Sequence, residues 1–252
     1  MTVPIYLINL DRSVDRLHFV AQRLETLGLS FSRIAAVDGA RLTDEERISF
    51  ISQRPRDGRR GWRQGQIGCF LSHFHAWRQI AAASDTYGLV LEDDIHLSDV
   101  TPAVLNDISW IPADADIVRL ESTGQWLSLG KPVATAACRP IRALRSAAWG
   151  AGAYLMSREA ATSLLCSDPA LQTPADDFLF NRNGSSIAQS MTTYQIVPAI
   201  AVQDKFSAEE ATAEGFGSNI ETDTINARLR GFSAFRRRVT STLRGKTPVE
   251  FA

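Results

Sequence analysis

The sequence contains few cysteines, and those that it has form no pattern. Cys69, Cys138 and Cys166 are the only three in 252 residues, and they lie far apart. Close cysteine pairs are typical of metal sites, and even sets of cysteines in a short secreted chain are typical of disulfide frameworks. Neither arrangement is present here, so we expect a protein of a reducing compartment.

Long apolar runs and a large excess of one charge are also missing. The apolar run at residues 3–8 is too short for a membrane span, and it has no basic region before it and no small-residue cleavage site after it. A cytoplasmic protein is therefore expected. Acidic and basic residues nearly balance, at a net charge of −1, so no nucleic-acid partner is expected.

Common phosphate-binding and nucleophile motifs do not occur either. The absence of G-x-G-x-x-G and G-x-x-x-x-G-K removes the main support for a dinucleotide site or a P-loop. There is no G-x-S-x-G, and nothing else resembles a catalytic Ser or Cys triad. With 44% hydrophobic and 22% charged residues, the chain has the composition of a globular protein that can bury one sizeable core.

Strand and helix patterns alternate along the chain. The expected strands are short, β-rich apolar runs, and the expected helices carry apolar residues at helical spacing. Thr43 and Glu46 form a capping box, and Gly28 is placed to end the first helix. We expect strands at residues 4–10, 31–37, 87–91, 117–120 and 153–156, and helices beginning near Ser13, Thr43, Gly65, Thr101 and Ser157. This order predicts an α/β fold with a mainly parallel, Rossmann-like sheet and helices on both faces.

Residues 54–65 have a different composition. Five arginines stand there among Pro55, Gly58, Gly61 and Gly65, with Trp62 inside the run. The run has no period, so it predicts a mobile basic loop.

Three consecutive carboxylates end the apolar run at residues 87–91. Glu92, Asp93 and Asp94 repel one another and resist burial, so a cation should lie nearby. Ligands of open α/β sheets bind beyond the carboxyl ends of strands, and hard oxygen ligands suit Mn²⁺ or Mg²⁺. The pattern therefore indicates a metal site, with a solvated acidic turn as the alternative.

Arg12 and Arg16 lie one helical turn apart at the start of the first expected helix. Free backbone N–H groups and two guanidinium groups at this junction would form an anion site suited to a diphosphate. The alternative is a surface helix on which the arginines pair with Asp11 and Asp15.

Two other groups of polar residues have simpler explanations. His73 and His75 form H-x-H, but two residues apart on a helix they point to different faces, so a two-His metal site is not expected. A single His73 bonded to its surroundings is the commoner outcome. Asp176 and Asp177 stand at the start of another expected helix, where capping is the simplest role.

Taken in order, these segments resemble glycosyltransferase family 25, the lipooligosaccharide galactosyltransferase type. The resemblance runs from Ile5 to about Asp176, with a weaker echo at residues 197–198, Gln203 and Ser218. The segments that carry it are INLDR at 8–12 with Arg16, AVDG at 36–39, GQIGC at 65–69 with Ser72 and His73, LVLEDD at 89–94, GAYLMS at 152–157 with Ala160, and PAD at 174–176.

The resemblance implies a GT-A type fold and inverting transfer of a hexose from a UDP-sugar. Galactose is the expected hexose, and the expected acceptor is a hydroxyl of a glycan such as lipopolysaccharide or lipooligosaccharide. Members that act on collagen are larger and secretory, so the compact length points to a bacterial enzyme. The implied residues of the nucleotide-sugar site are Asn9, Leu10, Arg12, Arg16, Asp38, Ser72, His73 and Glu92.

The resemblance also assigns chemical roles. Asp93 and Asp94 would hold Mn²⁺ (or Mg²⁺), in a motif that departs from D-x-D because Glu92 stands first. The ion would stabilise the leaving diphosphate, with the two arginines assisting. Inversion needs a base for the acceptor hydroxyl, and Asp176 is the first candidate, with Glu121 at the end of the strand at 117–120 the second.

Two other functions remain open at this point. A nucleotide-sugar-binding protein could keep the same pocket without turnover. A metal-dependent phosphohydrolase could use the same carboxylates and metal. Release of UDP that requires an acceptor would separate a transferase from both.

The chain from about residue 225 onward changes character. Seven basic residues and no acidic ones lie between residues 228 and 246, and apolar residues from Ile225 to Leu243 recur at helical spacing. A basic amphipathic helix is typical of membrane-surface binding, so we expect a catalytic domain at 1–224 and a basic amphipathic segment at 225–252. Peripheral contact with an anionic inner membrane through residues 225–246 is one hypothesis. Packing of the apolar face on the enzyme is the other, and Gly231 weakens such a helix by about 1 kcal/mol.

Overall fold

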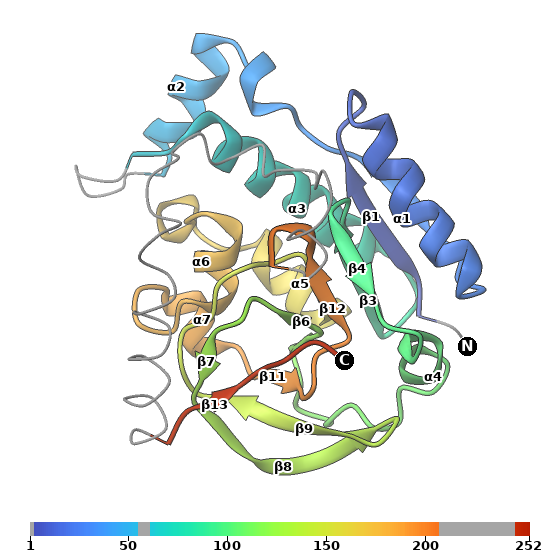
Figure 1. The fold of residues 1–252 in the computed structure, drawn as a ribbon. Coiled ribbons are helices and arrows are strands. Elements are labelled where there is room, and N and C mark those ends of the chain that lie inside the picture. The colour runs from blue at the N-terminus through green and yellow to red at the C-terminus, as the bar shows by residue number, and fades with distance from the viewer. Residues whose placement is uncertain (1–2, 55–60, 207–244) are drawn as a thin grey trace, which may run out of the picture.

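A central sheet of eight strands organises the chain (Figure 1). The computed structural model describes residues 3–54, 61–206 and 245–252. Along the sheet the strands follow the order β2-β1-β3-β10-β5-β11-β9-β8. Their bounds are β1 Ile5–Asn9, β2 Ser32–Ala35, β3 Tyr87–Glu92, β5 Ile117–Arg119, β8 Leu129–Ala136, β9 Arg139–Leu144, β10 Ala153–Ser157 and β11 Thr193–Ile196.

Most strands of this sheet point in one direction. β1 pairs in parallel with β2 and β3, and β5 pairs in parallel with β11. β10 is antiparallel to β3 and β5, and β9 is antiparallel to β11 and β8. Within this sheet, only β9 and β10 therefore run against the rest. The expected α/β fold with a mainly parallel sheet is confirmed.

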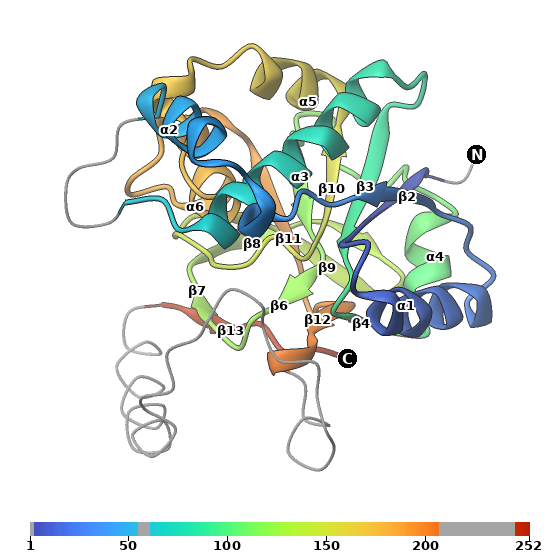
Figure 2. The same ribbon diagram turned by 90° about the horizontal axis from the view of Figure 1, so that it is seen from above.

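Helices cover both faces of the sheet, as expected. Figure 2 shows α3 and α5 on one face and α1 and α4 on the other. Neighbouring side chains of a strand point to opposite faces, so Tyr6 packs in one core with Phe70 of α3, and Leu7 packs in the other core with Leu24 of α1. Burying such a side chain contributes about 1.5–3 kcal/mol. The helices are α1 Val14–Thr26, α2 Asp44–Ser52, α3 Gln64–Ala82, α4 Thr101–Leu105, α5 Arg158–Leu165, α6 Ala175–Phe180 and α7 Ser186–Ser190.

The local signals for helix ends are mostly confirmed. Both hydrogen bonds of the capping box between Thr43 and Glu46 are formed at the start of α2. Gly28 follows α1 with a φ of 68°, which a residue with a Cβ rarely adopts. Ser157 caps α5 through its side chain. α1 begins next to Ser13 as predicted, although the hydroxyl of this N-cap residue accepts no capping hydrogen bond.

The expected basic loop at residues 54–65 is shorter than predicted. α3 already begins at Gln64, and Trp62 before it is buried with its ring 4.9 Å from that of Phe50. The guanidinium carbon of Arg54 lies 4.0 Å from the centre of the Phe50 ring. Packing around Phe50 therefore orders Arg54 and Trp62, the residues at either end of the stretch 55–60. The arginine-rich composition gave no indication of this packing. Residues 55–60 lie outside the described residues.

Two smaller sheets complete the structure. β4 (Ile95–Leu97) and β6 (Glu121–Ser122) both pair with β12 (Ala201–Gln203). β13 (Thr247–Pro248) pairs with β7 (Trp126–Leu127), and Val249 beside it is 3% exposed. Residues 245–252 therefore pack on the main body of the protein. The rest of the expected basic segment, up to residue 244, lies outside the described residues. None of the described helices is long and apolar enough to cross a membrane.

Candidate active site

A cavity of about 760 Å³ opens where β1 and β3 end. These strands are parallel neighbours, with Ile8 opposite Glu92, so their carboxyl ends meet at one edge of the sheet. That edge is where open α/β sheets bind ligands. Of the residues expected to take part, all but Glu121 line this cavity: Asn9, Leu10, Arg12, Arg16, Asp38, Ser72, His73, Glu92, Asp93, Asp94 and Asp176.

Asp93 is held by two donors from the first strand and helix. Its Oδ2 accepts a hydrogen bond of 2.7 Å from the Asn9 amide, and its Oδ1 lies 3.2 Å from Arg16 Nη1. Burial raises the pKa of Asp93, while Asn9 and Arg16 act in the opposite direction. The contacts of Asp93 with Asn9 and Arg16 thus join residues 9–16 to residues 92–94. Both segments were expected to contribute to one site.

Asp94 receives fewer and longer hydrogen bonds from the protein than Asp93 does. Within the described residues, its carboxylate has one hydrogen-bond donor, the Gln203 amide at 3.4 Å. Burial first, and then the neighbouring charge of Glu92, raise the pKa of Asp94 to about 7. A divalent cation beside this carboxylate would offset both causes. Asp93 and Asp94 therefore fit a hard ion such as Mn²⁺ or Mg²⁺, which binds through one or two carboxylates together with substrate phosphates.

Glu92 is bound by a buried network rather than exposed to solvent. His73 Nε2 lies 3.1 Å from Glu92 Oε1, and the Gln203 amide donates to Glu92 Oε2 at 2.7 Å. His73 Nδ1 lies 2.9 Å from the hydroxyl of Tyr154, which also accepts a hydrogen bond from Trp77 Nε1 at 2.8 Å. Burial alone would raise the pKa of Glu92, but the hydrogen bond and charge of His73 lower it below its ordinary value. The expectation of a single His73 bonded to its surroundings is confirmed.

Arg12 and Arg16 both line the cavity, and each faces an acid from another element. Arg12 forms an ion pair with Asp38, and its side chain is 53% exposed. Arg16 pairs with Asp93, and its side chain is 11% exposed. Guanidinium groups at the start of α1 therefore lie next to the acidic residues, in the place expected of an anion site.

The turn after β2 is pressed against the first part of α3. A Cβ on Gly39 would overlap the carbonyl oxygen of Gln64, and a Cβ on Gly68 would overlap that of Val37. The hydroxyl of Ser72 accepts a hydrogen bond of 2.9 Å from the Val37 backbone and so joins helix and turn. This close approach gives a structural reason for the two glycines and for Ser72, and it places Asp38 on the cavity wall.

Asp176 reaches the cavity from α6, on a different part of the fold. Its Oδ1 accepts a hydrogen bond of 2.9 Å from the Asp177 backbone, and its Oδ2 lies 3.4 Å from the Gly150 nitrogen. Burial and the charge of Asp177 raise the pKa of Asp176. Pro174, and not an aspartate, occupies the N-cap position of α6. Asp176 is therefore a partly buried carboxylate directed at the cavity.

Glu121, the second candidate base, is not among the residues that line the cavity. It is 1% exposed, and its carboxylate lies 3.1 Å from Arg119 Nη2 and 3.2 Å from the Gly152 nitrogen. Burial raises the pKa of Glu121 to about 8 despite the opposing charge of Arg119. In this structure Glu121 belongs to a buried ion pair behind the site.

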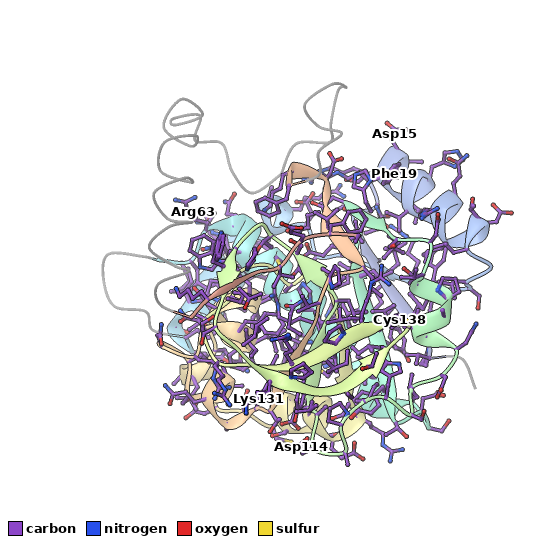
Figure 3. All side chains as sticks on the ribbon, turned by 60° about the horizontal axis from the view of Figure 1, so that its bottom comes forward. Asp15, Phe19, Arg63, Asp114, Lys131 and Cys138 are labelled. Atoms are coloured by element: carbon purple, nitrogen blue, oxygen red, sulfur yellow. The ribbon has the colours of Figure 1, made fainter. Side chains whose placement is uncertain are left out.

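Several cavity residues were not singled out from the sequence. Lys205 follows β12, and its positive charge acts against the rise in the pKa of Asp94. Arg63, labelled in Figure 3, lies just before α3. Its side chain also lines the cavity. Gln203 appeared only in the weak echo beyond residue 176. A lone lysine after a short strand carries no local signal, and the arginine-rich run at 54–65 was the only pointer to Arg63.

Comparison with known protein families gives one match. A family model described as "Glycosyltransferase family 25 (LPS biosynthesis protein)" matches residues 2–179. This span includes every expected site residue, from Asn9 to Asp176.

Individual curated relatives are similar over parts of their length. A protein of Aedes aegypti named Glycosyltransferase 25 family member is 37% identical over 97 residues, which are 36% of this chain and 16% of the relative. The lipooligosaccharide biosynthesis protein lex-1 of Haemophilus influenzae is 29% identical over 152 residues, 56% of this chain and 50% of the relative. Procollagen galactosyltransferase 1-A of Xenopus laevis is 27% identical over 248 residues, 88% of this chain and 38% of the relative. The chain thus spans half or less of the length of these relatives.

Among solved structures, a glycosyltransferase involved in the glycosylation of the major capsid of PBCV-1 is similar with a TM-score of 0.42 and 11% sequence identity. The similarity covers 84% of this chain and 96% of that structure. At this score the likeness adds nothing to the family match.

Proposed function

Because the chain belongs to glycosyltransferase family 25, we propose that it is an inverting, metal-dependent transferase that moves a hexose from a UDP-sugar to a hydroxyl of a glycan. One observation carries the proposal: the two carboxylates Asp93 and Asp94, the arginines Arg12 and Arg16, and Asp176 all line a single cavity. Galactose is the proposed hexose, because relatives of this chain are named galactosyltransferases.

The proposed donor site lies at the junction of β1 and α1. Breaking the bond between the sugar and UDP develops negative charge on the diphosphate, and cationic groups that are already in place stabilise that charge. Arg16 in the first turn of α1 is oriented by Asp93, and the more exposed Arg12 lies in the turn just before the helix. We assign both side chains to the diphosphate, together with the backbone N–H groups at the start of α1.

Asp93 and Asp94 are the proposed ligands of Mn²⁺ or Mg²⁺. When bound, the ion would act as a Lewis acid on the diphosphate. The support is the fit between a hard ion and these residues: two carboxylates, each 8% exposed, on a cavity wall, one of them with a pKa near 7.

Asp176 is the proposed base. The acceptor oxygen would attack the anomeric carbon, its proton would pass to the Asp176 carboxylate, and the bonding electrons would leave with UDP. A base must come within hydrogen-bond reach of the hydroxyl that it deprotonates. Asp176 lines the cavity and Glu121 does not, which favours Asp176. Its raised pKa also moves its basicity toward neutral pH.

The deciding experiment is product analysis with a panel of UDP-hexoses, with Mn²⁺, in the presence and absence of a truncated lipooligosaccharide acceptor. A transferase releases UDP only with the acceptor and produces a glycan whose new linkage is inverted relative to the donor. Nucleotide release without acceptor would identify a phosphohydrolase. Affinity for UDP-sugars without any release would identify a binding protein.

The proposed acceptor is a lipid-linked glycan such as lipopolysaccharide, by analogy with the Haemophilus influenzae relative. Such an acceptor is presented at a membrane surface, and we propose that the basic segment 225–246 brings the cytoplasmic enzyme to it. Each basic residue near an anionic surface contributes about 1 kcal/mol. The seven basic residues between positions 228 and 246 would therefore attract the enzyme to an anionic membrane surface.

The membrane proposal is best tested by charge reversal, since residues 245–252 pack on the main domain and a truncation would remove β13. Replacing Arg236, Arg237 and Arg238 with Glu should weaken binding to phosphatidylserine vesicles at low salt by about a hundredfold or more. The same change at the surface residues Arg41 and Arg47 is the control and should have little effect. If the unaltered protein ignores these vesicles at low salt, the membrane role is wrong.

A further inference from the structure

A second group of potential metal ligands lies in the wall of the same cavity. The thiol of Cys69, Nε2 of His73 and the carboxylate of Glu92 all lie within 4.8 Å of one another, and no other such group of three occurs among the described residues. Cys69 and His73 are four residues apart on α3, so they face the same side of the helix. Glu92 ends β3 and meets them there.

We propose that Cys69, His73 and Glu92 bind a thiophilic divalent cation of the Zn²⁺ class. Thiolate and imidazole ligands favour Zn²⁺, whereas carboxylates and water favour Mn²⁺ and Mg²⁺. The site is therefore chemically separate from the hard-ion ligands Asp93 and Asp94. Three protein ligands facing a cavity leave the fourth position open to water or a ligand, as in zinc sites that are not purely structural. This proposal goes beyond the proposed transferase function and does not depend on it.

Two of the three distances between the donor atoms are close to those of tetrahedral zinc. With Zn–S near 2.3 Å and Zn–N or Zn–O near 2.0 Å, ligand atoms in a tetrahedron lie about 3.3–3.5 Å apart. Cys69 Sγ is 3.8 Å and His73 Nε2 is 3.1 Å from the same oxygen, Glu92 Oε1. Both distances differ from the tetrahedral values by only a few tenths of an ångström. The third pair, Cys69 Sγ and His73 Nε2, lies within 4.8 Å.

Buried partners already orient two of the three ligands. The Gln203 amide holds Oε2 of Glu92 at 2.7 Å, which leaves Oε1 facing Cys69 and His73. His73 Nδ1 lies 2.9 Å from the Tyr154 hydroxyl, so the ring presents Nε2 to the cavity. A metal on Nε2 places the ring proton on Nδ1, and the Tyr154 oxygen can accept it alongside the hydrogen bond from Trp77. Such outer contacts are typical of ligating histidines.

The binding step balances without a redox partner. The Cys69 thiol loses its proton to solvent, the thiolate sulfur forms the bond to the cation, and no electrons are transferred. The hydrogen bond between His73 and Glu92 gives way to two bonds from these residues to the same ion. One positive charge is gained at a place where Glu92, Asp93 and Asp94 already concentrate negative charge.

The test uses the full chain freed of metal by chelation. Titration with Zn²⁺ against a chromophoric chelator should give one ion bound per chain. Cys69→Ser should weaken that binding on the order of a hundredfold or more, since even the loss of an outer partner costs 10–100-fold. Cys138→Ser is the matched control, because Cys138 is exposed and lies outside the cluster. It should leave the affinity unchanged.

Co²⁺ supplies a spectroscopic check. In the double variant Cys138→Ser/Cys166→Ser, Cys69 is the only thiol left in the chain, so a thiolate-to-cobalt charge-transfer band in the near ultraviolet would assign the ligand directly. This measurement also decides the question if Cys69→Ser fails to fold. Absence of the band, or Zn²⁺ binding that survives in Cys69→Ser and disappears in Asp94→Asn, would overturn the proposal.

Discussion

Asp94 gives the sharpest test of the metal proposal, because stability and activity should respond to its replacement in opposite directions. Its pKa is raised from 3.8 to about 7 in the folded protein. Well below pH 3.8 the carboxyl is neutral in both the folded and the unfolded chain, and it costs nothing. As the pH rises from 4 to 7, the unfolded chain ionises more readily than the folded one, and the free energy of unfolding falls.

The size of the effect follows from the shift. A rise of about three units, at 1.36 kcal/mol per unit, corresponds to a cost of about 4 kcal/mol above pH 7 in the metal-free protein. Asp94→Asn removes the ionisable group and keeps an oxygen that can accept the hydrogen bond from Gln203. The variant should therefore be more stable than the wild type at pH 8 by up to about 4 kcal/mol, and within about 1 kcal/mol of it at pH 4.

A bound divalent cation should reverse this ranking. Mn²⁺ with UDP should stabilise the wild type, because it stabilises the ionised Asp94 in the folded state. Asp94→Asn should show little of this stabilisation and no Mn²⁺-dependent transfer. Urea unfolding at pH 4 and pH 8, with and without Mn²⁺ and UDP, measures the pH-dependent stability difference and the stabilisation by the cation. A transfer assay with and without Mn²⁺ measures the loss of activity.

The control is Asp99→Asn, at a carboxylate whose side chain is 88% exposed and pairs with Arg23 on the surface. It should change stability by no more than about 1 kcal/mol and leave the response to Mn²⁺ intact. The reasoning is refuted if metal-free Asp94→Asn is no more stable than the wild type at pH 8, or if Mn²⁺ stabilises both proteins equally.

Three other positions carry separate predictions. Arg16→Ala should weaken UDP binding in calorimetry by about 1.5–3 kcal/mol, while Arg23→Ala on the same helix should not; equal losses in both would contradict a diphosphate contact. Asp176→Asn should lower kcat on the order of 10²–10⁴-fold without changing UDP affinity, and Asp177→Asn should stay near the wild-type rate; a normal kcat for the first variant would move the base elsewhere. Gly68→Ala should destabilise the fold in urea by about 1–3 kcal/mol, because its Cβ would overlap the turn after β2; unchanged stability would show that this turn can move.

The part of the site that was predictable lies close together in the sheet. Two apolar runs, each followed by polar residues, placed Asn9 and Glu92 at the ends of strands, and parallel pairing brought those ends together. A parallel sheet buried on both faces produces continuous apolar runs, which are easy to recognise. The contact of Arg16 with Asp93 was not predicted from the sequence, and the structure shows it because the helix after β1 starts at the same edge.

The outer part of the sheet was not predictable in the same way. β8 and β9 pair through residues 129–144, but Gly130 and Pro132 interrupt the strand pattern in β8. β8 is an edge strand with several exposed residues, where proline is tolerated, so its sequence lacks an apolar run. Gln203 and Lys205 depend on β12, a three-residue strand that pairs with strands about 80 and 100 positions earlier in the chain. Short strands with distant partners leave little local trace.

Glu121, the second candidate for the base after Asp176, does not line the cavity. Its place at the end of a strand suggested a catalytic carboxylate. Arg119 ends β5 and Glu121 begins β6, with one residue between them. The two side chains form a buried ion pair at 3.1 Å, which depends on how the chain passes from one sheet to the other. Asp176 has no such ion pair among the described residues, and its hydrogen-bond donors are backbone N–H groups. Its carboxylate can therefore still act as a base.

The three acidic residues Glu92, Asp93 and Asp94 differ in which protein groups lie against their carboxylates. This difference indicates which carboxylate a bound cation would stabilise most. Arg16 faces Asp93, and His73 with an amide faces Glu92. Burial penalises all of them, yet only for Asp94 is the pKa raised as far as about 7 among these three neighbours. The pKa of Asp93 is also raised, but that of Asp94 is raised furthest, even though Arg16 and Lys205 act in the opposite direction. Ionised Asp94 next to the cavity therefore lowers the stability of the metal-free fold. Such a cost is expected where an external cation completes the site, because the bound cation stabilises the ionised carboxylate that burial destabilises.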